Sequence, residues 1–123
     1  MQPFTVGPVG HFSLAVRDPH AAAAWFQRCL LLEPFMDAGE SCSVGNDSIT
    51  IWFHPGEPSP ETVDHISFQL KSRAELERAL KHLKREGADL EDPGDDEYLG
   101  LWFHDPDGYR WELSAYVGKE RSS

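Results

Sequence analysis

The chain has 123 residues, with 11 Lys and Arg against 21 Asp and Glu and a formal net charge of −10. This length predicts a single domain, residues 1–123, that can bury an ordinary core. The acidic balance argues against nucleic acid and anionic membranes as partners. Cys29 and Cys42 form neither a disulfide framework nor a C-x-x-C motif, and no stretch is long and apolar enough to predict a membrane span. We therefore expect a cytoplasmic protein.

The first half of the chain predicts one strand, one helix and three further strands. Apolar and polar residues alternate in the first and last of these strands, which is typical of a sheet with one buried face. The helix begins where Asp18 caps the first turn, and Pro34 stops it. The predicted elements are a strand over 9–16, a helix from Pro19 to about Leu31, two short strands within 35–45, a turn at 45–47 and a strand over 48–54.

The second half, which follows a Pro-rich linker over residues 55–60, predicts the same order of elements. Ser72 and Glu75 predict a capping box at the start of a helix, and Gly87 is typical of its end. The Asp-Pro-Asp-Gly sequence predicts a tight turn between the last two strands. The predicted elements are a strand over 63–70, a helix from Arg73 to Gly87, a short strand over 88–90, a strand over 98–104, a turn at 105–108 and a strand over 109–115.

The two halves form an internal repeat. Residues 11–16, HFSLAV, match residues 65–70, HISFQL, at an offset of 54 residues, and a capped helix follows each copy. A strand, a helix and further strands that occur twice in one chain indicate a duplicated supersecondary unit.

One face of the predicted strands is polar without being an ordinary solvent-exposed surface. It carries two tryptophans and four histidines but only two formal charges, an inventory that is typical of a ligand cavity. The apolar residues share the opposite face, which the two helices can cover. The polar face collects His11, Ser13, Thr50, Trp52, His54, His65, Ser67, Gln69, Trp102, His104, Arg110, Glu112 and Ser114.

A metal site is the sharpest hypothesis for this face. His11 and His65 hold equivalent places in the repeat, so pseudo-symmetry would bring them together, with Glu112 nearby. Two imidazoles and one carboxylate with open positions bind Fe(II), Mn(II), Ni(II) or Zn(II). A single strand histidine is more often a hydrogen-bonded polar residue than a ligand, and that reading stays open for His54 and His104.

The motifs resemble the vicinal oxygen chelate superfamily, which includes glyoxalase I, fosfomycin and bleomycin resistance proteins and extradiol dioxygenases. The resemblance implies an α+β fold of two βαβββ modules, residues 7–55 and 62–117, which form a curved, partly open mixed sheet with the helices on its outer face. It also implies a homodimer with shared sites, in which His11 meets His65 and Glu112 of the partner subunit. The motifs that carry the resemblance are Gly10–Pro19, Asp64–Phe68 and Asp105–Leu113.

Individual subfamilies differ from this chain at specific positions. Glyoxalase I has a glutamate where Thr50 stands, and extradiol dioxygenases have a tyrosine where Trp102 stands. Fosfomycin resistance proteins have a threonine where Ser13 stands, and they supply a lysine before the final pair of strands, where this chain has the acidic residues 91–97. This acidic segment would repel a phosphonate, and only Arg110 and Lys119 or Arg121 could compensate. Bleomycin resistance proteins are acidic but lack the metal triad. The resemblance therefore leaves the reaction open.

We expect a metal-dependent enzyme for a small oxygen-chelating substrate, as a lyase, isomerase, thiol transferase or dioxygenase. One divalent transition metal, Fe, Mn, Ni or Zn, would act as a Lewis acid, with His54 or His104 as general base. The alternative is a protein that binds a cationic or aromatic small molecule without turnover, as bleomycin resistance proteins do. The expected ligands are His11, His65 and Glu112, and the expected substrate contacts are Ser13, Thr50, Trp52, Gln69, Trp102 and Arg110.

Overall fold

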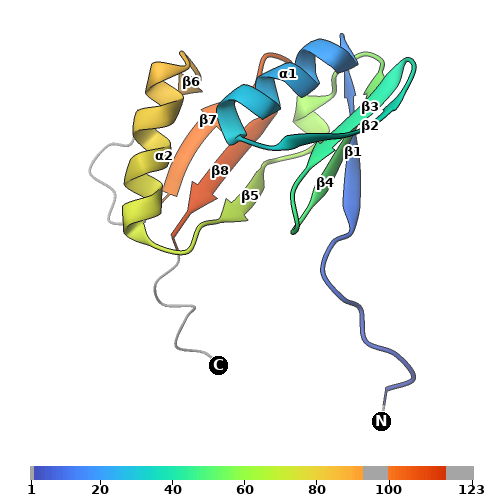
Figure 1. The fold of residues 1–123 in the computed structure, drawn as a ribbon, viewed down its shortest axis with the longest axis horizontal. Coiled ribbons are helices and arrows are strands. Elements are labelled where there is room, and N and C mark those ends of the chain that lie inside the picture. Colours follow the sequence, from blue (N-terminus) through green and yellow to red (C-terminus); the bar gives the residue numbers. More distant parts are fainter. Residues whose placement is uncertain (1, 93–99, 116–123) are drawn as a thin grey trace.

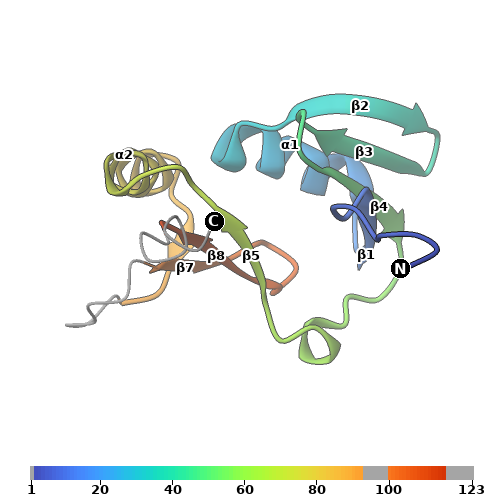
Figure 2. The same ribbon diagram turned by 90° about the horizontal axis from the view of Figure 1, so that it is seen from below.

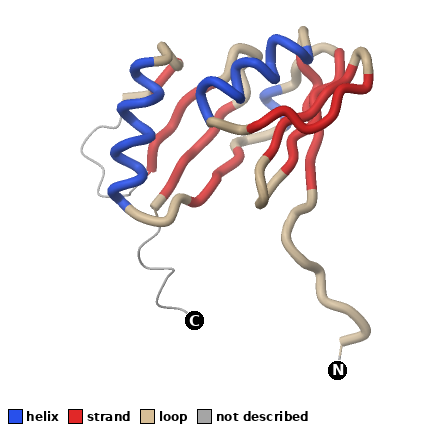
Figure 3. The backbone as a smooth tube through the Cα atoms, in the orientation of Figure 1, coloured by secondary structure: helices blue, strands red, loops and turns tan. Residues whose placement is uncertain are grey.

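The computed structural model describes residues 2–92 and 100–115. Two four-stranded sheets, each with one helix, make up this part of the chain (Figures 1 and 3). The first unit contains β1 (His11–Val16), α1 (Pro19–Leu30), β2 (Glu33–Ala38), β3 (Ser41–Gly45) and β4 (Thr50–Pro55). The second contains β5 (Ile66–Gln69), α2 (Arg73–Arg85), β6 (Asp89–Leu90), β7 (Gly100–His104) and β8 (Arg110–Ser114), after a short 3₁₀ turn, η1 (Pro60–Thr62).

Both sheets are mixed and have the same topology. Their strand orders are β1-β4-β3-β2 and β5-β8-β7-β6. β1 pairs in parallel with β4, and β5 pairs in parallel with β8. The predicted α+β fold of two βαβββ modules is therefore confirmed. β1 and β5 are edge strands of two separate sheets in the described part of the chain. The module limits 7–55 and 62–117 stay a prediction, because residues 116 and 117 lie outside the described residues.

Local signals set the ends of both helices. Asp18 accepts a hydrogen bond from the Ala21 amide at the start of α1, and Leu31 ends α1 with a left-handed φ of 57°. At α2, the Ser72 hydroxyl caps the Glu75 amide as predicted. The Glu75 carboxylate accepts a hydrogen bond from the Lys71 amide, which lies one residue before the cap. The capping box is therefore shifted by one position.

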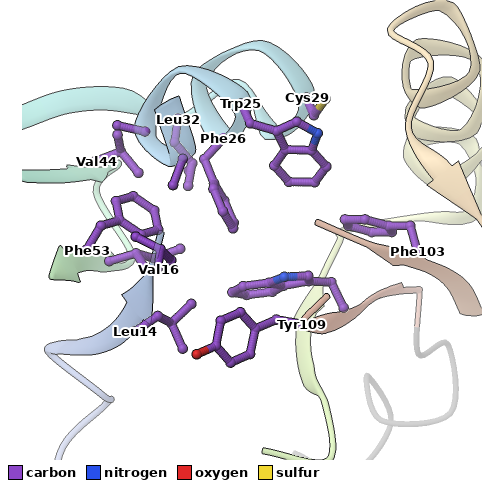
Figure 4. Packing of buried hydrophobic residues seen from close by; sticks show 14 of the residues in the cluster. Leu14, Val16, Trp25, Phe26, Cys29, Leu32, Val44, Phe53, Phe103 and Tyr109 are labelled. Atoms are coloured by element: carbon purple, nitrogen blue, oxygen red, sulfur yellow. The ribbon is translucent and has the colours of Figure 1, made fainter. Parts of the chain in front are cut away.

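The core lies between the two sheets, and α1 joins them. Phe26 is 1% exposed, and its ring centroid lies 5.1 Å from Phe53 of the first sheet and 5.1 Å from Trp111 of the second. Figure 4 shows this cluster, and Figure 2 shows α1 between the two sheets. Because the apolar faces of both sheets turn toward α1, their polar faces turn outward. Cys29 is buried in the same cluster.

The Asp-Pro-Asp-Gly turn between β7 and β8 is held by the buried carboxylate of Asp105. One oxygen accepts from the amides of Asp107 and Tyr109 at 2.9 and 3.1 Å, and the other accepts from the Trp111 indole at 2.9 Å. Burial raises the pKa of the Asp105 carboxyl, although these hydrogen bonds oppose the effect. Gly108 has φ 93°, which explains the glycine in the motif.

The same turn docks the second module against the first. The Tyr109 hydroxyl donates to the Ala15 carbonyl at 2.7 Å and accepts from the Ser59 amide at 3.1 Å. The Arg17 amide donates to the Asp107 carboxylate at 3.0 Å. These contacts connect β1, the linker and the final hairpin, so the turn fixes the relation of the two modules as well as the hairpin. No helix in the described ranges is both long and apolar enough to cross a membrane.

Candidate metal and substrate site

The polar face of the first sheet carries five of the predicted site residues. Backbone pairing puts His11 beside Thr50 and Ser13 beside Trp52, and directly paired residues point to the same side of a sheet. His54 lies further along β4, where its Nδ1 is 2.7 Å from the Ser41 hydroxyl and its ring stacks on Trp52 at 6.1 Å. These residues form what we call the N-terminal wall.

The polar face of the second sheet forms the C-terminal wall. Ser67, Glu112 and Trp102 lie in one row across β5, β8 and β7. Arg110 pairs with His104 in the same register, so both side chains lie on this face. His65 precedes β5, and Gln69 lies at its end. The structure thus brings Glu112, His65, Trp102, His104, Arg110 and Gln69 onto one surface.

The Glu112 side chain is buried, and one of its carboxylate oxygens has no hydrogen-bond partner in the described residues. The residue is only 3% exposed, and its Oε2 atom is buried without a hydrogen-bond partner. It is the only such side-chain atom in the described residues. A buried acceptor without a partner costs stability, so such groups are rare and call for an explanation such as an ion. The Glu112 carboxylate therefore fits a divalent metal.

His65 is oriented on both sides of its ring. Its Nδ1 lies 2.7 Å from the Asp64 carboxylate, and its ring meets Trp102 edge-on at 4.9 Å between centroids. The hydrogen bond to His65 lowers the pKa of Asp64. A carboxylate on one ring nitrogen directs the other toward a metal and makes it a stronger ligand. The strand predicted from residue 63 begins only at Ile66, which leaves Asp64 free to make this contact.

Arg110 is held by Glu91, a residue for which the sequence alone predicts no individual role. The Arg110 Nε and one terminal nitrogen donate to the two Glu91 oxygens at 2.7 and 2.9 Å. The guanidinium carbon lies 3.9 Å from the centroid of the Trp102 ring. Glu91 also lies 3.5 Å from His104 Nε2. The sequence offered only an acidic run over residues 91–97, of which 93–97 lie outside the described residues.

The two walls do not meet within one chain. His11 belongs to the N-terminal wall, whereas His65 and Glu112 belong to the C-terminal wall, and the shared core lies between them. No group of three or more His, Cys, Asp or Glu in residues 2–92 and 100–115 is placed to hold a metal ion. A cavity of about 800 Å³ opens elsewhere, between the end of α1 and α2, and of the predicted site residues only Gln69 lines it. The predicted roles of these residues stay predictions.

Solved structures with this fold are known. The fosfomycin resistance protein FosX from Mesorhizobium loti is 20% identical, with a TM-score of 0.78 over 97% of this chain and 100% of that chain. A FosX variant from Listeria monocytogenes, complexed with Mn(II) and a dihydroxypropylphosphonic acid, is 20% identical, with a TM-score of 0.73 over 90% and 93%. An integron cassette protein of V. cholerae is 20% identical, with a TM-score of 0.71 over 92% and 98%.

No curated protein matches the chain in a sequence comparison. A family match covers most of the chain, however, from residue 9 to residue 113. This range includes both walls, both helices and the Asp-Pro-Asp-Gly turn. The chain therefore belongs to the Glyoxalase/Bleomycin resistance protein/Dioxygenase superfamily.

Proposed function

We propose that this protein is a divalent-metal-dependent enzyme of its superfamily that acts on a small substrate through two substrate oxygen atoms. The ligands would be His11, His65 and Glu112. The observation that carries the proposal is the buried, unpartnered Oε2 of Glu112, on the wall where His65 is oriented by Asp64. Relatives of the same fold support it, since the Listeria FosX variant binds Mn(II).

The ligands of each site would come from two subunits of a homodimer. The two polar walls turn outward in one chain, so a second copy can place its N-terminal wall against the C-terminal wall of the first. β1 and β5 are edge strands in the described part of the chain, and unpaired edges are natural places for contact with another chain. A two-fold axis would then form two equal sites, each with His11 from one subunit and His65 and Glu112 of the partner subunit.

When bound, the ion would supply Lewis acidity to two substrate oxygens. Glu112 would contribute its negative charge, and Asp64 would hold the His65 ring in place. Of the two proposed general bases we favour His54, because the Ser41 hydroxyl lies 2.7 Å from its Nδ1 and orients the ring. Its stacking on Trp52 fixes the plane of the ring. His104 lies 3.5 Å from Glu91.

Metal content and Mn(II) titration test this proposal. Protein purified without a histidine tag should hold about one equivalent of a transition metal per subunit, as a three-ligand site with open positions does. His11→Ala and Glu112→Ala should abolish it with the fold retained by circular dichroism. His20→Ala, at an exposed histidine outside both walls, is the matched control and should keep the metal. A wild-type protein that neither contains nor takes up metal would contradict the proposal.

A second candidate function is the capture of a cationic or aromatic small molecule without turnover. The half-exposed rings of Trp52 and Trp102, one on each wall, and the net charge of −10 favour it. Binding of such a ligand would survive removal of metal and the Glu112→Ala substitution. The same titrations, repeated with an aromatic cation, therefore separate the two functions.

The cysteines agree with the cytoplasmic location that the sequence predicts. Cys29 and Cys42 are both free and buried. Burial raises the pKa of both thiols, which keeps them protonated and unreactive. The location itself stays a prediction.

A further inference from the structure

Arg110 is the only Lys or Arg in the eight strands that the structure describes, and its charge is already engaged. Two hydrogen bonds to Glu91, at 2.7 and 2.9 Å, occupy the edge of the guanidinium. One flat face lies on Trp102, 3.9 Å from the ring centroid. A planar pair of this kind between Arg and a carboxylate is the strong, directional form of ion pair.

Glu91 is fixed for this contact by the backbone. Its amide donates to the Trp102 carbonyl at 2.9 Å, which extends the pairing of β6 and β7 by one residue. The side chain thus starts from a defined point beside Trp102. The hydrogen bond from Arg110 lowers the pKa of the Glu91 carboxyl, so Glu91 remains ionised throughout the neutral range. Glu91 and Arg110 are each about one-third exposed, which leaves both next to the solvent side of the wall.

We propose that Glu91 is a specificity residue that cancels the charge of Arg110, so that the site accepts a neutral or cationic substrate and discriminates against phosphonates and other multiply charged anions. This inference rests on the proposed function, because it places the substrate at the C-terminal wall. Trp102, on which the Arg110 guanidinium lies, is paired with Glu112 and contacts the ring of His65. The Arg110–Glu91 pair therefore lies beside two of the proposed ligands.

The geometry explains why the pair decides the charge of the substrate. A phosphonate needs cationic donors for its oxygens, and among the described strands only Arg110 offers them. Glu91 holds two of the guanidinium hydrogens and places a negative charge where the anion would lie. An incoming anion must therefore displace Glu91 or tolerate its repulsion. A neutral oxygen chelator meets neither obstacle.

Calorimetric titration with methylphosphonate tests the proposal, with metal-free and Mn(II)-saturated protein. Wild type should bind the probe weakly. Glu91→Gln keeps the size of the side chain but frees the Arg110 charge, so the affinity should rise by about tenfold or more, as one added charge-assisted hydrogen bond implies. The double variant Glu91→Gln/Arg110→Gln should lose the gain.

Asp89→Asn is the matched control. Asp89 lies on the same short strand, opposite His104, and its substitution removes the same charge without touching the Arg110 pair; it should change the affinity less than about twofold. The proposal is overturned if Glu91→Gln gains nothing in either form of the protein, if Asp89→Asn gains as much, or if the gain survives in the double variant. A wild type that takes up no Mn(II) contradicts the proposed function instead, and the metal-free titrations still decide the role of Glu91.

Discussion

Replacing Glu112 by methionine should make the metal-free protein more stable while it abolishes metal binding. Glu112 is 3% exposed, and its Oε2 lacks a partner in the described residues. A buried acceptor of this kind costs roughly 1–3 kcal/mol. Methionine has a similar volume and no group that requires a hydrogen bond, so Glu112→Met should recover most of this cost. A rise of 1 kcal/mol corresponds to about 4 °C in Tm for a domain of this size.

The metal should reverse the order of stability. A ligand at a free concentration of 100 times its Kd stabilises the folded state by about 2.7 kcal/mol. Wild type should gain this stabilisation from Mn(II), whereas Glu112→Met should gain none. The order of the two Tm values should therefore change: the variant should have the higher Tm in a chelator, and wild type should have a Tm at least as high as the variant in saturating Mn(II).

Differential scanning calorimetry with EDTA and with Mn(II) measures both effects. Glu33→Met is the matched control, because Glu33 is an exposed carboxylate on the edge strand β2. It should leave the response to Mn(II) intact and should not raise the metal-free Tm. If Glu112→Met lowers the metal-free Tm, the carboxylate supports the fold through contacts of its own, and the inference that the buried Oε2 serves as a metal ligand is refuted.

Three further predictions concern the fold that positions the site. Phe26→Ala should destabilise the protein by roughly 3–5 kcal/mol in urea unfolding, because the ring fills the junction of both sheets. Tyr109→Phe should cost about 1–3 kcal/mol in the same assay, because the Ala15 carbonyl and the Ser59 amide each lose a partner. Burial raises the pKa of Asp105, so its folded state binds the proton more tightly. The contribution of Asp105 to the free energy of unfolding is therefore largest in acid and falls as the pH rises through the raised pKa. Urea unfolding at several pH values should show this decline, and Asp105→Asn should remove it.

The fold could be predicted because its determinants are local or repeated. Alternation along β1 and β4 assigns the apolar face that the structure buries, from Leu14 and Val16 to Ile51 and Phe53. Caps and turn residues mark the helix ends, and the 54-residue repeat indicates two copies of one unit. Each of these signals depends on residues a few positions apart, or on a pattern that occurs twice.

Contacts between modules and between distant strands could not be predicted in this way. Glu91 and Arg110 are 19 residues apart, and their pairing depends on how β6, β7 and β8 align. In the sequence, Glu91 is only the first member of an acidic run. The place of α1 between the two sheets is likewise a property of the whole packed core, since an amphipathic helix shows which face is apolar but not which second sheet that face meets.

Mixed dimers can show whether a site spans two subunits. Protein with His11→Ala keeps an intact C-terminal wall, and protein with Glu112→Ala keeps an intact N-terminal wall. If each site combines the walls of two chains, a dimer of one variant with the other contains one complete site and one site that lacks both ligands. Neither variant alone should then bind Mn(II), because each homodimer contains only incomplete sites.

Unfolding and refolding an equal mixture of the two variants should restore Mn(II) binding at about a quarter of the sites, since half of the dimers are mixed and each has one complete site. Two copies of the same variant, refolded together, serve as the control and should recover nothing. A site built within one chain predicts no recovery in either mixture, because every chain lacks one ligand. The recovered fraction therefore separates a site shared between subunits from an intrachain site, without a crystal of the dimer.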